Sequence, residues 1–392
     1  MARRMELAGL RIALFSGNYN MVRDGANQAL NRLVGYVLGK GAHVRVYSPT
    51  IDEPAFPPTG DLVSIPSVPI PGRSEFRFPL SLTASIREDL AAFKPNVLHV
   101  SSPDVVSHRA VTWAREHGIP VLASVHTRFE TYPRYYGLGF TEPLVEAILR
   151  RFYRRCDALV APSPSMVEVL KQQRMSFDVS IWSRGVDRTI FGPDKRDPAW
   201  RRELGFAEDD VVIAFLGRLV MEKGLDKFTE TMRLLRERGA PHKVLVIGEG
   251  PARKWFEDNL GEEACFIGFR SGSALGQALA SADLLFNPSV TETFGNVTLE
   301  AMASGLPVVA AGATGTSSLV QDGVSGTLIA PEGDVSPAYS DAIARYIADP
   351  ALRAQHGAAG ELRSRDFSWD AINQAVADVY LRLVEARGAQ LT

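Results

Sequence analysis

Only two cysteines, Cys156 and Cys265, occur among the 392 residues of this chain. Their spacing fits neither a disulfide framework nor a metal site, and such low usage is typical of a reducing compartment. Long apolar runs are also missing, so we expect neither a signal peptide nor a membrane-spanning helix. A net charge of −2 excludes an overall basic field for nucleic acid. These absences predict a cytoplasmic protein that is soluble, or at most peripheral on the inner face of the plasma membrane.

Two signatures of nucleotide enzymes are absent as well. No Asp-x-Asp pair occurs, so the usual carboxylates for the metal of a sugar nucleotide are missing, and the seven histidines show no ligand spacing on one helix. We therefore predict that the protein needs no metal and no other cofactor. The first predicted strand is followed by Phe15–Asn20 (F-S-G-N-Y-N) instead of G-x-G-x-x-G, which disfavours a dinucleotide-dependent oxidoreductase.

What the chain does have is a steady alternation of short β-rich runs with helical patterns. This alternation predicts an α/β fold in which parallel sheets are covered by helices. In the first half the expected strands are Arg11–Ser16, His43–Ser48, Val97–Val100, Val121–Val125 and Ala158–Ala161. The expected helices there are Gly25–Gly39, Val105–His117, Glu142–Arg155 and Pro164–Gln173. In the second half the expected strands are Val211–Leu216, Lys243–Ile247, Cys265–Ile267, Asp283–Phe286 and Val308–Ala310.

The length of the chain suits two domains. Residues 184–198 are rich in charge, Gly and Pro and are typical of a linker, so we predict one Rossmann-like domain over 1–185 and a second over 186–368. The last helix, about 369–392, could pack on either half, including back on the first. Residues 49–79 hold eight prolines and are predicted to form a long irregular excursion. Two such sheets facing each other would bind a ligand in the cleft at their strand ends.

One segment suggests a ligand site: residues 287–307, N-P-S-V-T-E-T-F-G-N-V-T-L-E-A-M-A-S-G-L-P. A strand stops before Pro288, Gly295 forms the tip of a polar loop, and a helix of small residues follows. Two carboxylates, Glu292 and Glu300, lie on either side of this glycine. They suit the hydroxyls of a sugar and of a ribose, with a phosphate between them at the helix start, where free N–H groups favour anions. The alternative is a capped surface helix with two solvated carboxylates, since the spacing alone also arises by chance.

A second segment, F-L-G-R-L-V-M-E-K-G from Phe215 to Gly224, puts Arg218 and Lys223 just past a buried strand. A glycine on either side lets the backbone approach a ligand. Two fixed cations there could neutralise a diphosphate leaving group, which is the main electrostatic demand of glycosyl transfer. Taken alone, the two could equally be ordinary charges in a strand-to-helix loop. Together with the 287–307 segment, they favour a nucleotide-sugar site.

The motifs G-R-L-x-x-E-K-G, V-I-G-E-G-P and E-T-F-G-N-V-x-L-E-A-M-A-S-G-L-P-V-V resemble those of the retaining glycosyltransferases of family four, which have the GT-B fold. The resemblance extends over essentially the whole chain. It implies that Glu292 contacts the transferred sugar and Glu300 the ribose, while Arg218 and Lys223 bind the diphosphate. The catalytic residues that it implies are His126, Arg218, Lys223 and Glu292. The further donor-binding residues that it implies are Gly25, Gly248, Gly268, Phe269, Thr293, Phe294, Gly295 and Asn296.

In the first domain the resemblance is less complete. Family members carry a Gly-Gly pair where this chain has Asp24-Gly25-Ala26, so only Gly25 is retained, and its N–H would face the donor phosphates. His126, within S-V-H-T-R-F-E, would lie where donor sugar and acceptor meet, although a lone histidine after a strand is more often structural. The acceptor side would be formed by Asn18, Tyr19, Asp24, Arg128, Tyr132, Arg134 and Tyr135.

Several first-domain motifs narrow the resemblance: D-G-A-N, R-F-P-L, Y-Y-G-L-G and W-S-R-G-V-D. They are most similar to the bacterial GDP-mannose-dependent α-mannosyltransferases and to the sulfoquinovosyl and glucuronosyl transferases that build glycolipids. This implies transfer of a hexosyl unit, mannose first, from GDP-mannose to a lipid-linked or glycolipid acceptor. The alternative is UDP-glucose, UDP-glucuronate or UDP-sulfoquinovose with a diacylglycerol or soluble acceptor. A GT-B sugar-nucleotide epimerase and a non-catalytic nucleotide-sugar sensor also stay open.

Basic and aromatic residues gather at Arg73–Phe78 and at Ile148–Arg155, the latter with four arginines on a short helical stretch. Such segments can rest on anionic lipid headgroups. The alternative is a solvated arginine face above the sheet. We therefore expect a GDP- or UDP-sugar donor, a lipid acceptor and an anionic membrane surface as partners, and no nucleic acid.

Overall fold

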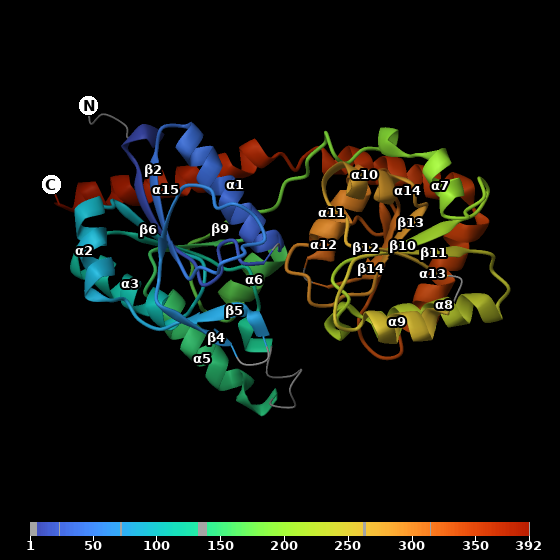
Figure 1. The fold of residues 1–392 in the computed structure, drawn as a ribbon, viewed down its shortest axis with the longest axis horizontal. Coiled ribbons are helices and arrows are strands. Elements are labelled where there is room, and N and C mark those ends of the chain that lie inside the picture. The colour runs from blue at the N-terminus through green and yellow to red at the C-terminus, as the bar shows by residue number, and fades with distance from the viewer. Residues whose placement is uncertain are drawn as a thin grey trace. The chain divides into compact units, whose positions relative to one another are not determined.

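The computed structural model describes residues 6–22, 24–70, 73–131, 139–261, 264–313 and 315–391. The chain forms two compact units, one comprising Met1–Ser183 with Trp369–Thr392 and the other Arg184–Ser368 (Figure 1). Each unit is built on a parallel sheet with helices packed around it, which confirms the predicted α/β class.

The first unit contains a seven-stranded parallel sheet in the order β3-β2-β1-β6-β7-β8-β9. The strands are β1 (Arg11–Phe15), β2 (His43–Ser48), β3 (Asp61–Ser64), β6 (Val97–Val100), β7 (Val121–Ser124), β8 (Ala158–Ala161) and β9 (Val179–Ile181). The helices are α1 (Gly25–Gly39), α2 (Ala84–Phe93), α3 (Val105–Glu116), α5 (Glu142–Tyr153), α6 (Pro164–Gln172) and α15 (Trp369–Leu391), with 3-10 turns at Leu7–Gly9, Phe129–Thr131 and Gly139–Thr141. Strands β6 to β8 are buried along their whole length, which explains why their sequences are continuous apolar runs rather than alternating ones.

The C-terminal helix α15 belongs to this first unit, where it packs against α1, β6 and β9. The hydroxyl of Tyr380 lies 2.6 Å from Nδ1 of His99 in β6, and both side chains are buried. Burial lowers the pKa of His99 to about 3, so its ring is neutral at physiological pH. At the surface Arg382 pairs with Asp178 at 2.6 Å. These contacts tie the end of the chain to the sheet formed by its beginning.

Residues 49–79 are more regular than the sequence predicts. They include β3, which joins the sheet edge, and an antiparallel hairpin of β4 (Ser67–Ile70) and β5 (Arg73–Pro79). The prediction of an irregular excursion is therefore wrong. Pro69 pairs with Arg77 and Pro79 with Ser67 in the hairpin. Each strand of a two-stranded sheet has one free edge, where a residue without an N–H removes no ladder bond.

The second unit contains a six-stranded parallel sheet in the order β12-β11-β10-β13-β14-β15. The strands are β10 (Val212–Leu216), β11 (Lys243–Ile247), β12 (Ala264–Gly268), β13 (Leu284–Asn287), β14 (Val308–Ala311) and β15 (Gly326–Ile329). The helices are α7 (Pro198–Glu203), α8 (Leu225–Glu237), α9 (Arg253–Leu260), α10 (Gly272–Ala280), α11 (Asn296–Ala303), α12 (Thr316–Leu319), α13 (Ser336–Ala348) and α14 (Pro350–Ser364), with 3-10 turns at Pro193–Lys195 and Met221–Lys223. Every strand predicted in the two halves is present, with its ends within one residue of those expected.

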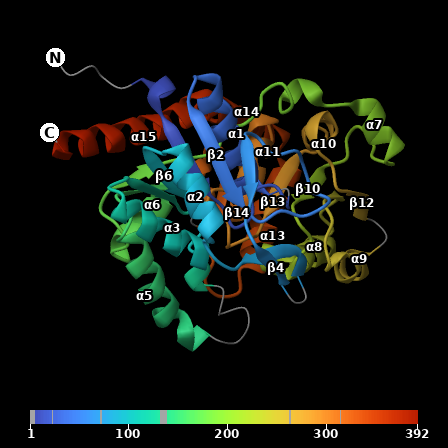
Figure 2. The ribbon, with the colours of Figure 1, turned by 60° about the vertical axis from the view of Figure 1, so that its left-hand side comes forward.

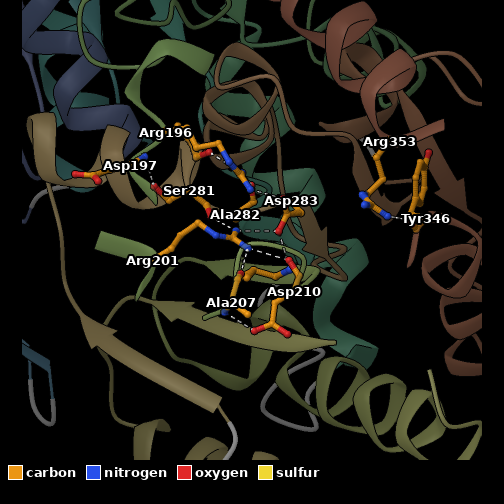
Figure 3. Close-up of polar contacts among 12 residues, drawn as sticks. Arg196, Asp197, Arg201, Ala207, Asp210, Ser281, Ala282, Asp283, Tyr346 and Arg353 are labelled. Atoms are coloured by element: carbon orange, nitrogen blue, oxygen red, sulfur yellow. Dashed lines mark hydrogen bonds and ion pairs between the residues drawn. The ribbon is translucent and has the colours of Figure 1, made fainter. Parts of the chain in front are cut away.

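A buried arginine fixes the amino ends of the two central strands of this sheet (Figure 3). Arg201 of α7 is 2% exposed, and its guanidinium donates to three main-chain carbonyl oxygens. It also pairs with the Asp283 carboxylate at 3.0 Å. The same carboxylate accepts a hydrogen bond from the Val212 N–H at 2.9 Å, which joins the start of β10 to the start of β13. A buried charge network of this kind is expensive to disturb, because removing one partner leaves the other unpaired.

The strand order of each sheet reverses once. In the first unit β2 and β3 lie on one side of β1 and β6 on the other; in the second, β11 and β12 lie on one side of β10 and β13 on the other. In open parallel sheets ligands bind beyond the carboxyl ends of the strands at such a reversal. A ligand site is therefore expected at the loops after β1 and β6 in the first unit and at those after β10 and β13 in the second.

Candidate functional site

The two segments that suggest a ligand site, 215–224 and 287–307, both leave the second sheet at its reversal point, where the strand order changes direction between β10 and β13. The loop after β10 carries Arg218 and passes through the 3-10 turn Met221–Lys223 into α8. The loop after β13 carries Glu292 and ends at Gly295, just before α11. Because β10 and β13 are hydrogen-bonded neighbours, the two loops emerge side by side.

Glycines allow these loops to approach closely. Gly224 has φ +75°, and a Cβ added there would lie 3.0 Å from the carbonyl oxygen of Pro288. Gly295, with φ +97°, turns the chain into α11. On its other side the β13–α11 loop is held by Gly315, whose N–H donates to the Glu292 carbonyl oxygen at 2.8 Å. A Cβ on Gly315 would lie 2.6 Å from the backbone of Phe294, so no side chain fits there.

An ion pair joins the two loops: Nζ of Lys223 donates to Oε1 of Glu292 at 2.6 Å. The side chains are only 28% and 16% exposed, so solvent screens the pair less than a surface pair. An ammonium has three donors and a carboxylate has about four acceptor positions, so each group can bind a ligand while the pair persists. The arrangement can hold an anionic group on the lysine and hydroxyls on the glutamate.

The second carboxylate of the motif is in a different environment. Glu300 lies in the second turn of α11, and burial raises the pKa of its carboxyl to about 8. Within the described residues this carboxyl accepts no hydrogen bond. Oδ1 of Asn296, in the first turn of the same helix, is also buried without a partner in the described part of the chain. Glu300 is half-buried, and the Asn296 oxygen is buried without a donor among the described residues, which is uncommon and costly. The two side chains suit a ligand that brings hydroxyl groups.

The loops after β10 and β11 touch backbone to backbone. The Leu219 N–H donates to the Glu249 carbonyl oxygen at 2.9 Å. A Cβ on Gly248, which has φ +149°, would lie 1.9 Å from the carbonyl oxygen of Gly217, and one on Gly250 would lie 2.4 Å from that of Leu219. The packing of the two loops therefore requires glycine at these positions.

The remaining predicted donor-binding residues differ in exposure. Phe269, which follows Gly268 at the end of β12, is 56% exposed and presents an aromatic ring that could stack on a base. Thr293 is half-buried. Phe294 is buried, and the centroid of its ring lies 5.9 Å from that of Phe367. The Phe294 side chain thus anchors the loop in the core of the second unit.

In the first unit the loop after β1 is fixed by its own polar side chains. Asp24 caps α1, accepting a hydrogen bond from the Asn27 N–H at 2.8 Å, and Gly25 is the first residue of the helix. Asn18 accepts from the Met21 N–H at 3.2 Å. Tyr19 is completely buried and donates to the Thr59 carbonyl oxygen at 2.7 Å. The side chains of Tyr19 and Asp24 thus have structural contacts that account for them.

His126 follows β7, one strand away from the reversal point of the first sheet. Its ring stands edge-on to that of Trp182, with centroids 5.1 Å apart. Arg128 pairs with the buried Glu130 at 2.7 Å. His126 and Arg128 thus lie in one loop, and the side chain of each contacts another residue of the first unit. Three further residues predicted for the acceptor side lie outside the described residues: Tyr132, Arg134 and Tyr135.

Comparisons with known proteins identify the family of the chain. The family models for Glycosyltransferase Family 4 and for Glycosyl transferases group 1 match residues 23–189 and 196–363. The GDP-mannose-dependent alpha-mannosyltransferase of Mycolicibacterium smegmatis is 30% identical over 331 residues, which are 83% of this chain and 85% of that protein. The chain belongs to glycosyltransferase family 4. The family predicted from the sequence is thereby confirmed.

This glycosyltransferase is also 32% identical over 313 residues to the sulfoquinovosyl transferase SQD2 of Arabidopsis thaliana, a match that covers 78% of this chain and 60% of SQD2. Among solved structures it is similar to the sucrose-phosphate synthase of Thermosynechococcus elongatus. The TM-score is 0.76 at 20% identity, over 96% of this chain and 99% of that one. At this identity the likeness concerns the fold alone, and it confirms the GT-B architecture.

Two residues that shape the loops of the two units, Gly315 and Ser102, could not be predicted from the sequence. Gly315 supports the loop of Glu292, although the sequence around it carries no motif that predicts this. In the first unit Ser102 accepts a hydrogen bond from the Gly17 N–H at 2.9 Å and donates to Asp104 at 2.6 Å, which links the ends of β1 and β6. The only local signal for this link is S-S-P-D after a buried strand, with Asp104 as the cap of α3.

In the described ranges no group of three or more His, Cys, Asp or Glu side chains could hold a metal ion, and metal-free activity stays a prediction. Nor is any helix in the described part of the chain long and apolar enough to cross a bilayer.

Proposed function

We propose that this glycosyltransferase moves a hexosyl unit, mannose first, from a nucleotide diphosphate sugar to a lipid-linked or glycolipid acceptor, with retention of anomeric configuration. The observation that carries the proposal is the ion pair of Lys223 and Glu292 at the reversal point of the second sheet. It combines a cation for a diphosphate with an acceptor of hydroxyl hydrogen bonds. Arg218 lies in the same loop as the lysine, and α11 begins just after the glutamate.

In this proposal the hexose of the donor lies against Glu292 and the main chain of residues 293–296, and the ribose hydroxyls donate to Glu300. Hydrogen bonds to the ionised form of a carboxyl lower its pKa. Because the pKa of Glu300 starts at about 8, donor binding at neutral pH should release a proton from it. Gly248, Gly268 and Phe269 would border the nucleobase.

Arg218, Lys223 and the N–H groups at the start of α11 would bind the diphosphate. As the glycosidic bond breaks, negative charge grows on the leaving phosphate, and these fixed groups stabilise it without reorganising. The leaving phosphate oxygen would accept the proton of the acceptor hydroxyl on the face from which it departs, so no covalent enzyme intermediate is needed. We propose that the two cations replace a metal in this role.

GDP-mannose is the first donor to test, because the mannosyltransferase of M. smegmatis is similar over most of both chains. UDP-glucose, UDP-glucuronate and UDP-sulfoquinovose are the alternatives, since side chains alone do not identify the base in a pocket bordered largely by backbone. For the acceptor side we propose the loop of His126, and Gly25 at the start of α1 stays a proposed donor-binding residue.

Alanine variants test the assignment of the two cations. Lys223→Ala and Arg218→Ala should each lower turnover by about 100-fold or more, as removal of a preorganised charge-stabilising group does. Lys227→Ala and Arg202→Ala serve as controls, because both residues lie on helices of the same unit, with Arg202 exposed and the Lys227 side chain 44% exposed. Unchanged transfer rates in both site variants would refute the assignment.

Two other functions predict different behaviour. A GT-B sugar-nucleotide epimerase would convert the donor in the absence of any acceptor. A nucleotide-sugar sensor would bind the donor tightly and turn over no acceptor. Incubation with donor alone, followed by addition of lipid or sugar acceptors, separates these two functions from glycosyl transfer.

A further inference from the structure

Helix α5 of the first unit exposes apolar side chains that its fold does not need. Leu144 and Ile148 are 64% and 53% exposed and lie one turn apart on the helix. Phe140, in the 3-10 turn that precedes α5, is 80% exposed. The opposite side of the helix, with Leu149 and Phe152, is buried in the core of the unit. The helix is therefore apolar both toward the core and toward solvent.

The exposed side continues into cations. Arg151, three residues after Ile148, is exposed and makes no hydrogen bond or ion pair within the described ranges. Arg154, three residues further on, is exposed while its Nε donates to the Arg174 carbonyl oxygen at 2.9 Å. That contact brings the exposed Arg174 to the same end of the helix. One surface thus has an apolar end and a cationic end.

The acidic residues of α5 do not cancel these charges. Glu142 and Glu146 are half-buried, and Glu146 forms an ion pair with Arg150 of the next turn. Arg150 is itself held against the protein, because its Nε donates to the Gln173 carbonyl oxygen at 2.7 Å. Arg151, Arg154 and Arg174 therefore dominate the charge of the exposed side.

We propose that this α5 face, made of Phe140, Leu144, Ile148, Arg151, Arg154 and Arg174, docks on an anionic lipid bilayer. A helix that presents apolar and cationic side chains together can lie in the headgroup layer, where the apolar groups leave water and the arginines meet anionic lipids. The choice of occupant rests on this charge complementarity. In both views α5 lies at the outer edge of its unit (Figures 1 and 2).

Docking would bring the acceptor-side unit to the membrane in which a lipid acceptor resides, and in this respect the inference rests on the proposed function. The contact itself requires neither donor nor turnover. Binding to vesicles is therefore measured on the free protein, so that failure of glycosyl transfer and failure of docking are distinguished.

The experiment is co-sedimentation of the full chain with vesicles of phosphatidylcholine alone and with vesicles that also contain phosphatidylglycerol. We expect binding to the anionic vesicles, with weakening at high salt. The Leu144→Glu/Ile148→Glu variant should bind at least about tenfold more weakly, because two apolar side chains no longer enter the interface. Arg151→Ala should bind about fivefold more weakly, the contribution of one cation near an anionic surface.

Matched controls keep the result specific. Leu362 on α14 is 63% exposed, so Leu362→Glu replaces a comparably exposed apolar side chain by a carboxylate in the other unit, as each of the two α5 substitutions does, and Arg202→Ala removes an exposed arginine elsewhere. Both should bind as the unaltered protein does. Thermal unfolding of all variants identifies any that are misfolded. If the Leu144→Glu/Ile148→Glu variant is misfolded, the vesicle binding of Arg151→Ala alone decides the test.

The proposal is overturned if the unaltered protein ignores both kinds of vesicle, or if Leu362→Glu weakens binding as much as the α5 variant. It is also overturned if the α5 substitutions abolish self-association or capture of another protein while vesicle binding stays constant.

Discussion

Replacing Glu300 by glutamine should stabilise the free protein at neutral and alkaline pH. Burial raises the pKa of this carboxyl from 4.5 to about 8. Between those values the folded chain keeps the proton and the unfolded chain releases it, so stability falls by about 1.4 kcal/mol for each pH unit. The loss is absent below about pH 4.5 and complete above about pH 8. Glutamine has nearly the same shape and never ionises.

At pH 7.5, three units above the unfolded pKa, the ionisation cost is up to about 4 kcal/mol. For a unit of this size about 1 kcal/mol shifts the Tm by about 2–4 °C, so Glu300→Gln could raise it by up to about 8–16 °C. The gain should shrink toward zero near pH 4.5. The same substitution should weaken stabilisation by GDP-mannose, because an amide binds the ribose hydroxyls less well than a carboxylate.

The assay is thermal unfolding of the wild type and Glu300→Gln from about pH 4.5 to pH 9. Glu208→Gln is the control, because Glu208 is an exposed glutamate of the same unit. A difference in Tm between Glu300→Gln and wild type that stays constant across this range, or that decreases as pH rises, would refute the reasoning about this carboxyl.

Three further predictions concern donor binding and the frame of the second unit. Titration of GDP-mannose near pH 7, repeated in buffers of different ionisation heat, should show proton release that disappears in Glu300→Gln; equal release in both proteins would place the titrating group elsewhere. Gly248→Ala should destabilise by about 2–3 kcal/mol or more in urea unfolding, because its Cβ would lie 1.9 Å from the Gly217 carbonyl oxygen at φ +149°. Gly239→Ala has positive φ but no atom within 4 Å, so it should cost only about 1 kcal/mol, and equal losses at the two sites would contradict the close approach of the loops. Arg201→Ala should cost about 3–5 kcal/mol because it leaves Asp283 and three carbonyl groups without this partner, while its exposed neighbour Arg202→Ala should change the urea midpoint little; similar midpoints for the two would argue against a buried network.

The central strands could be predicted from the sequence because their residues are buried on both faces. β8, for example, is a run of small and branched apolar residues between polar turns, and its predicted bounds match. The edge strands β9 and β15 were not predicted. β9 has only three residues, none of them buried, so its sequence lacks the apolar run that marks a central strand. The β4–β5 hairpin was not predicted either, because its sequence lacks a continuous apolar run and contains prolines, which disfavour a strand.

The site itself was only half predictable. Motif residues such as Arg218 and Glu292 could be predicted from the sequence. Their environments could not, because these depend on which strands are neighbours, and local sequence patterns do not predict strand order. The bond between Lys223 and Glu292 joins residues 69 positions apart. The raised pKa of the Glu300 carboxyl likewise follows from the packing of α11, which the spacing of two glutamates does not report.

The most direct test of the account measures release of the nucleoside diphosphate from GDP-mannose, with and without a membrane-lipid extract, for the wild type and for Lys223→Ala. We predict release that depends on the lipid, accompanied by a mannosylated lipid, and a loss of about 100-fold or more in the variant. The related UDP-sugars are run in parallel as donors. Donor conversion without any acceptor, or release by Lys223→Ala at the wild-type rate, would contradict the account.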